Sequence, residues 1–247
     1  MKVPPFHWWR TVFFLIPAIG VYTIVLGIVS ILSTLFDRRG YFAHGCARLW
    51  GRLILLTTGV RVHVHGVKPP SIANSYVFAS NHQSIYDIPV LFWTMPHQLR
   101  IISKASLGNF PFLGWHLRRA GHLLVDRDNP GASVLKKMRR MISQGASLII
   151  FPEGTRSRTG KLGRFKGGVF LLAIESGLPV VPISLSGSRH VMLKDRLMTC
   201  PGDVDVTIHE PIPTTGMTRE DARALAERVR TIVASAVVAD EPQEAGR

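Results

Sequence analysis

The feature that most constrains the fold is a long run of uncharged, mostly apolar residues near the amino terminus, at positions 11–36 (TVFFLIPAIGVYTIVLGIVSILSTLF). At about 1.5 Å of helical rise per residue, about 20 such residues cross the hydrocarbon core of a bilayer. Trp8 and Trp9 stand directly before the run, where the aromatic belt of a membrane interface lies. The sequence therefore predicts a membrane-embedded helix.

Whether this helix spans the bilayer is left open by the sequence. Pro17, Gly20 and Gly27 are expected to interrupt it, and residues 41–60 form a second apolar-rich helix with two arginines near its middle. Two such helices can also form a hairpin that dips into one leaflet. A cleaved signal peptide is the alternative, but the run exceeds the usual length of about 7–15 apolar residues, and no small-x-small cleavage site follows.

The charge balance predicts an anionic partner. The chain has 247 residues, and Lys plus Arg (30) exceed Asp plus Glu (16), for a formal net charge of +14. This surplus favours nucleic acid, an acidic membrane surface or phosphorylated substrates. Most of the basic residues follow the first apolar run, so we expect the catalytic body on the cytoplasmic face of a membrane, with the bacterial inner membrane as the expected location. Two cysteines, Cys46 and Cys200, exclude a disulfide framework and a four-thiolate zinc site.

The rest of the chain alternates between short apolar strands and helices. We expect strands at residues 77–79, 100–103, 122–125, 147–151, 180–185 and 204–208, and helices at 133–144, at 168–176 and from Thr218 onward, with Asp221 in a capping box. This alternation predicts an α/β fold with a mixed, largely parallel sheet flanked by helices. The expected organisation is an anchoring segment at 1–60, an α/β domain at 61–240 and a tail at 241–247.

The segment SNHQSIYD, at positions 80–87, carries the first chemical signal. It follows a predicted strand, and open α/β sheets place their ligands at the carboxyl ends of strands. If a helix begins near Ser84, His82 and Asp87 approach each other across its first turn. A carboxylate that accepts the Nδ1 proton leaves Nε2 free to remove a proton from a hydroxyl. The same spacing recurs at His190 and Asp195, so the spacing alone proves little, and the preceding strand singles out His82.

The segment FPEGTRSR, at positions 151–158, predicts a phosphate site. Glycine allows close backbone approach, and an arginine clamps phosphate through two parallel donors. No acidic residue lies between Arg156 and Lys166. Lys104, at the end of a predicted strand, and Arg127 are further candidate anion ligands. No clustered ligand set indicates a metal.

Four segments in this order resemble the blocks of the glycerolipid acyltransferases, the family of 1-acylglycerol-3-phosphate acyltransferases. They are NHQSIYD, Lys104 followed after nine residues by Gly-Trp and then by VDR, FPEGTR, and VVPISL with Pro182. One departure is Ala105-Ser106, where many relatives carry a charged pair after the lysine, which leaves substrate choice open.

The resemblance implies a fold, an activity and a set of site residues. The implied fold is an α/β sheet domain with a membrane-embedding helical amino end. The implied reaction moves an acyl group from an acyl thioester to the sn-2 hydroxyl of lysophosphatidate. The implied residues are catalytic His82 and Asp87, a phosphate-binding set of Glu153, Gly154, Thr155 and Arg156, and Lys104 with Arg127 from the middle block.

The implied partners are a lysophospholipid acceptor, an anionic membrane, and acyl-CoA or acyl carrier protein as co-substrate. No cofactor and no metal are expected. Transfer to glycerol 3-phosphate or another lysolipid, and hydrolysis of the thioester, remain alternatives. A non-catalytic basic protein that binds nucleic acid is disfavoured, because no recognised nucleic-acid-reading motif is present.

Overall fold

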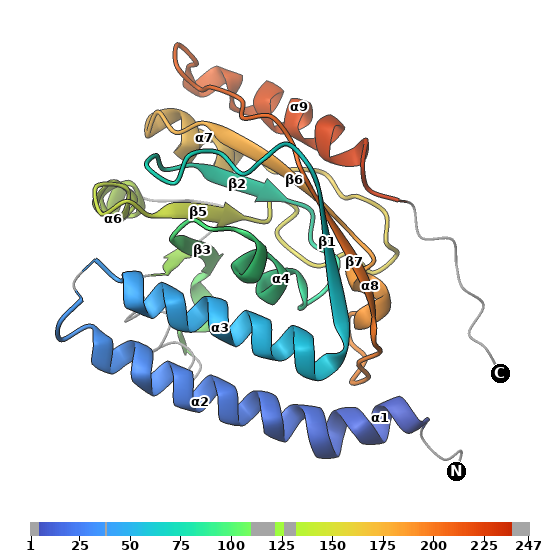
Figure 1. Ribbon diagram of the computed structural model, residues 1–247. Coiled ribbons are helices and arrows are strands. Elements are labelled where there is room, and N and C mark those ends of the chain that lie inside the picture. Colours follow the sequence, from blue (N-terminus) through green and yellow to red (C-terminus); the bar gives the residue numbers. More distant parts are fainter. Residues whose placement is uncertain (1–4, 38, 110–121, 126–131, 239–247) are drawn as a thin grey trace.

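A seven-stranded sheet forms the centre of the computed structural model, which describes residues 5–37, 39–109, 122–125 and 132–238 (Figure 1). The strand order is β1-β7-β6-β2-β5-β3-β4. The strands are β1 (Val60–Gly66), β2 (Val77–Ser80), β3 (Leu99–Lys104), β4 (Leu123–Val125), β5 (Ser147–Ile150), β6 (Val180–Ser186) and β7 (Gly202–Ile208). Within these described strands, each neighbouring pair is parallel except β6 and β7. The predicted mixed, largely parallel sheet is confirmed.

One strand, β1, was not predicted from the sequence. The central strands β2, β5 and β6 are buried along their whole length and read as continuous apolar runs, because helices cover both faces of the sheet. β1 pairs only with β7 and is mostly exposed. Its valines alternate with arginine and histidine (VRVHVH), which is the pattern of an edge strand with one solvated face.

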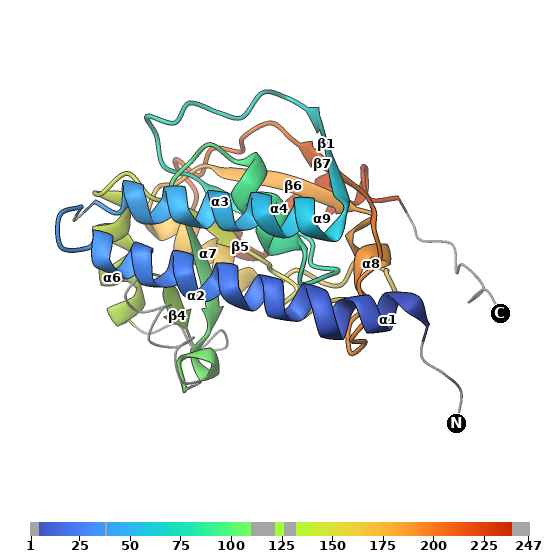
Figure 2. The same ribbon diagram turned by 60° about the horizontal axis from the view of Figure 1, so that its bottom comes forward.

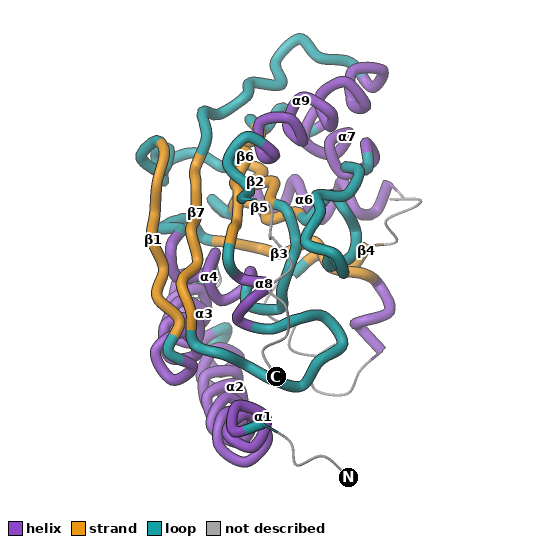
Figure 3. The backbone as a smooth tube through the Cα atoms, turned by 90° about the vertical axis from the view of Figure 1, so that its right-hand side faces the viewer, coloured by secondary structure: helices purple, strands orange, loops and turns teal. Residues whose placement is uncertain are grey.

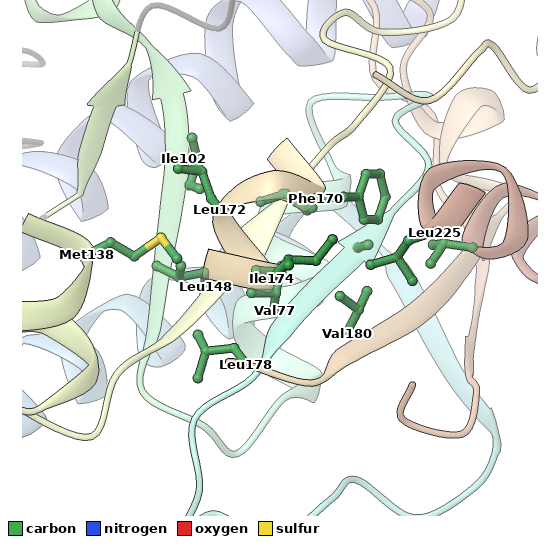
Figure 4. Close-up of a cluster of buried hydrophobic side chains, with 14 of the residues drawn as sticks. Val77, Ile102, Met138, Leu148, Phe170, Leu172, Ile174, Leu178, Val180 and Leu225 are labelled. Atoms are coloured by element: carbon green, nitrogen blue, oxygen red, sulfur yellow. The ribbon is translucent and has the colours of Figure 1, made fainter. Parts of the chain in front are cut away.

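Helices cover the two faces of the sheet, as Figure 3 shows from the side. On one face lie α6 (Ala132–Ile142), α7 (Gly167–Glu175) and α9 (Ala222–Ala234), whose apolar side chains form the core cluster of Figure 4. On the other face lie α3 (Tyr41–Thr58), α4 (Asp87–Thr94) and α8 (Ser188–Val191). Two short 3₁₀ turns, η2 (Ala105–Asn109) and η3 (Arg219–Asp221), complete the elements. The predicted capping box before α9 is confirmed, since the Thr218 N–H donates to Asp221 Oδ2 at 2.7 Å.

The amino-terminal apolar run is helical as far as Ser33, and its last three residues form a turn. It consists of α1 (Phe6–Arg10), a π-helical turn η1 (Thr11–Leu15) and α2 (Ile16–Ser33). The prediction that Pro17, Gly20 and Gly27 interrupt the helix is wrong. A proline has no N–H and crowds the carbonyl of the preceding turn, and here the wider π turn directly before α2 accommodates it.

The α2 helix lies alongside α3 as an antiparallel hairpin, visible from two directions in Figures 1 and 2. Hydrogen bonds hold the pair together, from Tyr22 Oη to Thr57 Oγ1 (3.1 Å) and from Trp50 Nε1 to Thr23 Oγ1 (3.0 Å). At its amino end the helix is also bonded to the α/β body, because Thr11 Oγ1 accepts from the Thr199 N–H at 2.8 Å. Phe6–Ser33 is the one helical stretch in the described part of the chain that is long and apolar enough to cross a membrane.

The α3 helix approaches α4 closely at Gly51. A Cβ at this position would lie 2.7 Å from the backbone oxygen of Pro89, whereas a Cβ at Gly45 of the same helix would meet no atom within 4 Å. We expect Gly51→Ala to lower the free energy of unfolding by about 1–3 kcal/mol, because the two helices must move apart. Gly45→Ala should raise it by about 1 kcal/mol through helix propensity. Denaturant unfolding of both variants measures the two changes in the free energy of unfolding. Equal changes in the same direction would contradict the close packing at Gly51.

Candidate functional site

Three loops meet at the edge of the sheet where the central parallel strands end. They follow β2, β5 and β6 at residues 81–86, 151–166 and 187–201. Main-chain hydrogen bonds join the first two loops, since the Ser157 N–H donates to the His82 oxygen at 2.8 Å. This edge is where open α/β sheets bind ligands.

His82 and Asp87 form a directly bonded pair. His82 Nδ1 lies 2.7 Å from Asp87 Oδ2, and the same carboxylate oxygen accepts the backbone N–H groups of Gln83 (2.8 Å) and Ser84 (2.9 Å). Asp87 is fully buried at the amino end of α4, where the helix dipole stabilises negative charge. A carboxylate that accepts the Nδ1 proton in this geometry leaves Nε2 free to act as a base.

The helix that follows this segment, α4, begins at Asp87, three residues after Ser84. The Asp87 carboxylate accepts the N–H groups of Gln83 and Ser84, and these bonds hold the preceding residues in a turn instead of a helix. His82 therefore reaches Asp87 from this turn.

Two further contacts fix the position of the imidazole. The ring of His82 stacks on the ring of Phe151, with centroids 4.0 Å apart and planes 19° apart, and the His82 side chain is 16% exposed. Next to it, Asn81 is fully buried and bonds twice to the backbone of Leu185 in β6, donating from Nδ2 to the oxygen and accepting the N–H on Oδ1, both at 2.8 Å.

Glu153 joins the first two loops through its carboxylate. Oε1 accepts the His82 N–H at 2.8 Å, and Oε2 accepts the Gly163 N–H at 2.9 Å. Burial raises the pKa of Glu153, although the two backbone donors act in the opposite direction. Both carboxylate oxygens thus serve the architecture of the loops, a role that the sequence analysis did not assign to Glu153.

Removing the Glu153 carboxylate should destabilise the folded protein, because this carboxylate connects two loops of the site. Glu153→Ala leaves two backbone N–H groups without their acceptor, so we expect the free energy of unfolding to fall by about 2–4 kcal/mol. Urea denaturation measures the change. The exposed Glu220 provides the matched control, and Glu220→Ala should stay within about 0.5 kcal/mol of the parent. Equal stabilities of the two variants would rule out a bridging role for Glu153.

The remaining residues of the predicted phosphate block lie beside the pair. Gly154 has φ +77°, a conformation that disfavours a side chain. Arg156 is partly exposed, and its guanidinium makes no ion pair with any residue that the structure describes. The sequence analysis missed Lys194, whose Nζ donates to Thr155 Oγ1 (2.9 Å) and to the Arg156 oxygen (3.1 Å). The block therefore presents two cations at the edge of the sheet.

The structure describes only some of the other predicted site residues. Lys104 ends β3, and Arg127 lies outside the described residues. In the second His-x4-Asp segment, His190 belongs to α8, whereas the Asp195 carboxylate lies 3.4 Å from Arg158 in an ion pair. Across the described ranges, no three His, Cys, Asp or Glu side chains are grouped so as to hold a metal ion.

An apolar cavity of about 550 Å³ lies between the helical hairpin and the α/β body. Its walls come from η1, α2, α3, the segment that carries Asp87 and the residues after α8, and include Leu15, Ile19, Trp50, Ile85, Ile88 and Met192. Ile85 and Ile88 flank Asp87 in sequence. The cavity therefore extends alongside the element that positions the His82–Asp87 pair.

Comparisons with known proteins identify the family of the chain. At 37% identity over 202 residues, the chain is similar to the chloroplastic 1-acyl-sn-glycerol-3-phosphate acyltransferase BAT2 of Brassica napus, with 78% of this chain and 58% of that protein covered. Identity to the human 1-acyl-sn-glycerol-3-phosphate acyltransferase alpha is 35% over 177 residues, covering 70% of this chain and 62% of that protein. The chain thus spans about three fifths of the length of these relatives.

A solved structure shares the fold. The crystal structure of the 1-acyl-sn-glycerophosphate (LPA) acyltransferase PlsC from Thermotoga maritima superposes with a TM-score of 0.72 at 24% identity, covering 93% of this chain and 95% of that chain. The Acyltransferase family profile matches residues 61–186, just over half of the chain. The resemblance seen in the four sequence blocks is confirmed, and the chain belongs to the acyltransferase family.

Proposed function

We propose that the protein transfers a fatty acyl group from an acyl thioester to the sn-2 hydroxyl of lysophosphatidate, giving phosphatidate. The observation that carries this proposal is the 2.7 Å contact between His82 Nδ1 and Asp87, with Arg156 on the adjoining loop, where it forms no ion pair with a described residue. A base and a phosphate ligand at one sheet edge suit a phosphorylated substrate with a free hydroxyl. The names of the similar proteins support the same acceptor.

The chemistry follows from the tautomer that Asp87 imposes. Nε2 of His82 takes the proton from the acceptor hydroxyl as the hydroxyl oxygen attacks the thioester carbonyl carbon. The carbon–sulfur bond then breaks, and the leaving thiolate takes the proton from the imidazolium. The buried carboxylate of Asp87 stabilises that imidazolium while the tetrahedral intermediate exists.

In the proposed complex, the cations beside His82 hold the acceptor phosphate. Arg156 supplies a forked donor, and Gly154 with Thr155 brings the backbone close to the ligand. Lys194 extends the predicted set, because it is bonded to Thr155 and to the Arg156 oxygen. Lys104 and Arg127 remain proposed ligands from the middle block. Glu153 acts by holding the loop in place.

The apolar cavity suits the acyl chains of the reactants. Its volume of about 550 Å³ falls within the range of typical ligand pockets, and its lining is predominantly apolar. The α2 helix, which forms one wall, also exposes an outward apolar face that includes Val21, Ile24, Val25, Ile28 and Leu32. This arrangement allows a chain to pass from lipid into the cavity without crossing water.

The exposed apolar face also supports attachment to a membrane. Because α2 is hydrogen-bonded to α3 at Tyr22 and Thr23, and the turn before it is bonded to the body at Thr11, we propose that the hairpin embeds sideways in one leaflet and does not span the bilayer. The basic body then faces an anionic lipid surface on the cytoplasmic side, in a bacterial inner membrane. Acyl-CoA or acyl carrier protein supplies the thioester.

Arg156 should determine the preference for a phosphorylated acceptor. Arg156→Gln is expected to raise KM for lysophosphatidate by about tenfold, the loss of one charge-assisted contact, and to leave transfer to the phosphate-free monoacylglycerol unchanged. Arg158→Gln is the matched control, because Arg158 is paired with Asp195. Steady-state kinetics with both acceptors measure the split. Equal losses on both acceptors would contradict a role in phosphate binding.

The function itself is tested by product analysis. Purified protein in lipid vesicles is given a labelled acyl thioester and, separately, lysophosphatidate, glycerol 3-phosphate, lysophosphatidylcholine or no acceptor, and the products are identified by mass. We expect phosphatidate from the first reaction and little labelled product from the others. Preferred labelling of another acceptor, or free fatty acid released equally with and without acceptor, would overturn the proposal.

A further inference from the structure

A second pocket lies on the opposite face of the sheet from the hairpin. It has a volume of about 440 Å³ and is lined by Arg164, Phe165, Arg223, Glu227 and Arg230. Three guanidinium groups against one carboxylate leave a surplus of positive charge. None of these residues belongs to the phosphate block beside His82.

The arginines of this pocket are largely free to bind a ligand. In the described part of the chain, Arg164 and Arg223 form no ion pair, and both side chains are exposed. Arg230 is closer to a partner, with Nη1 lying 3.5 Å from Glu227 Oε1. Such an exposed pair on one helix contributes little, so it does not prevent Arg230 from turning to a stronger anion. Arginine forks match phosphate oxygens in geometry.

The pocket is connected to the catalytic edge by a short stretch of chain. Arg164 directly follows Gly163, whose N–H is bonded to the carboxylate of Glu153, and the other oxygen of Glu153 holds the backbone of His82. Arg223 and Arg230 come from α9, which lies on the far side of the molecule from α2 and α3 in Figure 1. A ligand in this pocket therefore approaches from water, away from the hairpin.

These positions point to the water-soluble substrate of the reaction. We propose that the pocket binds the phosphate groups at the nucleotide end of acyl-CoA, while the pantetheine arm carries the thioester to His82. This inference rests on the proposed function, since it names the donor of that same reaction. A concave pocket of this size suits a small polyanion, which favours the nucleotide over the broad acidic surface of a carrier protein.

The first test measures binding without catalysis. Equilibrium dialysis with adenosine 3′,5′-bisphosphate, the phosphorylated end of CoA, is carried out on the full chain and on Arg223→Gln and Arg230→Gln. We expect each substitution to weaken binding by about tenfold. Arg228→Gln is the matched control, because Arg228 is an exposed arginine of the same helix that does not line the pocket. Binding that is unchanged in the two pocket variants, or weakened as much by Arg228→Gln, overturns the proposal.

The second test uses three donors. For Arg223→Gln and Arg230→Gln we expect KM for acyl-CoA to rise about tenfold at constant kcat, with unchanged kinetics for acyl-pantetheine, which lacks the nucleotide. Equal effects on both donors, or a larger effect on acyl carrier protein than on acyl-CoA, overturn the proposal. If the unsubstituted chain binds the bisphosphate but transfers no acyl group, the proposed function fails and the pocket assignment stands. If it transfers normally and the variants match it, the pocket assignment alone fails.

Discussion

Replacing His82 with alanine should lower kcat for acyl transfer by about 10²–10⁴-fold, the usual contribution of a positioned general base. The substitution removes the only nitrogen base bonded to Asp87 among the described residues. It leaves the two backbone bonds of residue 82, to Glu153 and Ser157, in place. Initial rates with saturating acyl donor and lysophosphatidate measure the loss.

The controls for this variant separate chemistry from folding and attachment. His82→Ala should keep its binding to lipid vesicles and a similar thermal transition, because the substitution lies outside the hairpin that we propose to contact lipid. His190→Ala removes the exposed histidine of the second His-x4-Asp segment and should retain most of the activity. A His82→Ala protein with full activity would remove this histidine from the mechanism.

Asp87→Asn tests the carboxylate with little change in shape. The side-chain oxygen can still accept the N–H groups of Gln83 and Ser84, which donate to the same oxygen as His82 in the parent. The negative charge that stabilises the imidazolium is lost, so we expect kcat to fall by about 10²–10⁴-fold with a small change in KM for the acceptor.

The separate effects on KM and on kcat distinguish a chemical role of Asp87 from a structural one. A structural role would disturb the loop and raise KM for both substrates, whereas loss of the charge lowers kcat alone. Asp195→Asn is the matched control, because Asp195 carries an exposed ion pair remote from Asp87 in sequence. Retention of the parental kcat in Asp87→Asn would show that the charge is not needed.

Much of the α/β fold was predictable because the buried strands carry a strong local signal. The apolar runs of β2, β5 and β6 are short, lack charges and alternate with helical segments, which leaves few arrangements other than a parallel sheet. β1 gave a weaker signal, because an edge strand buries few side chains and its polar positions resemble those of a loop. The tail at 241–247 lies outside the described residues.

The site was predictable from the sequence only where its residues lie close together along the chain. His82 and Asp87 are five positions apart, so one turn brings them together. Lys194 approaches Thr155 across 39 positions, and only the tertiary fold creates that contact. Glu153 was predicted as a phosphate ligand from its place in the motif, but its buried carboxylate holds two backbone amides. No local pattern distinguishes an acid that binds a ligand from one that organises a loop.

The two hydrogen bonds between the Asn81 side chain and the Leu185 backbone affect the rigidity of the site. A primary amide that donates to and accepts from one residue imitates the pairing of two strands, so it continues the β2–β6 ladder one step past Ser80. The residue that precedes His82 is thereby tied to the central strand β6. The backbone N–H of Leu185 should be among the slowest to exchange in hydrogen–deuterium exchange. Motion that opens the site to a reactant should then come from the cavity walls contributed by α2 and α3.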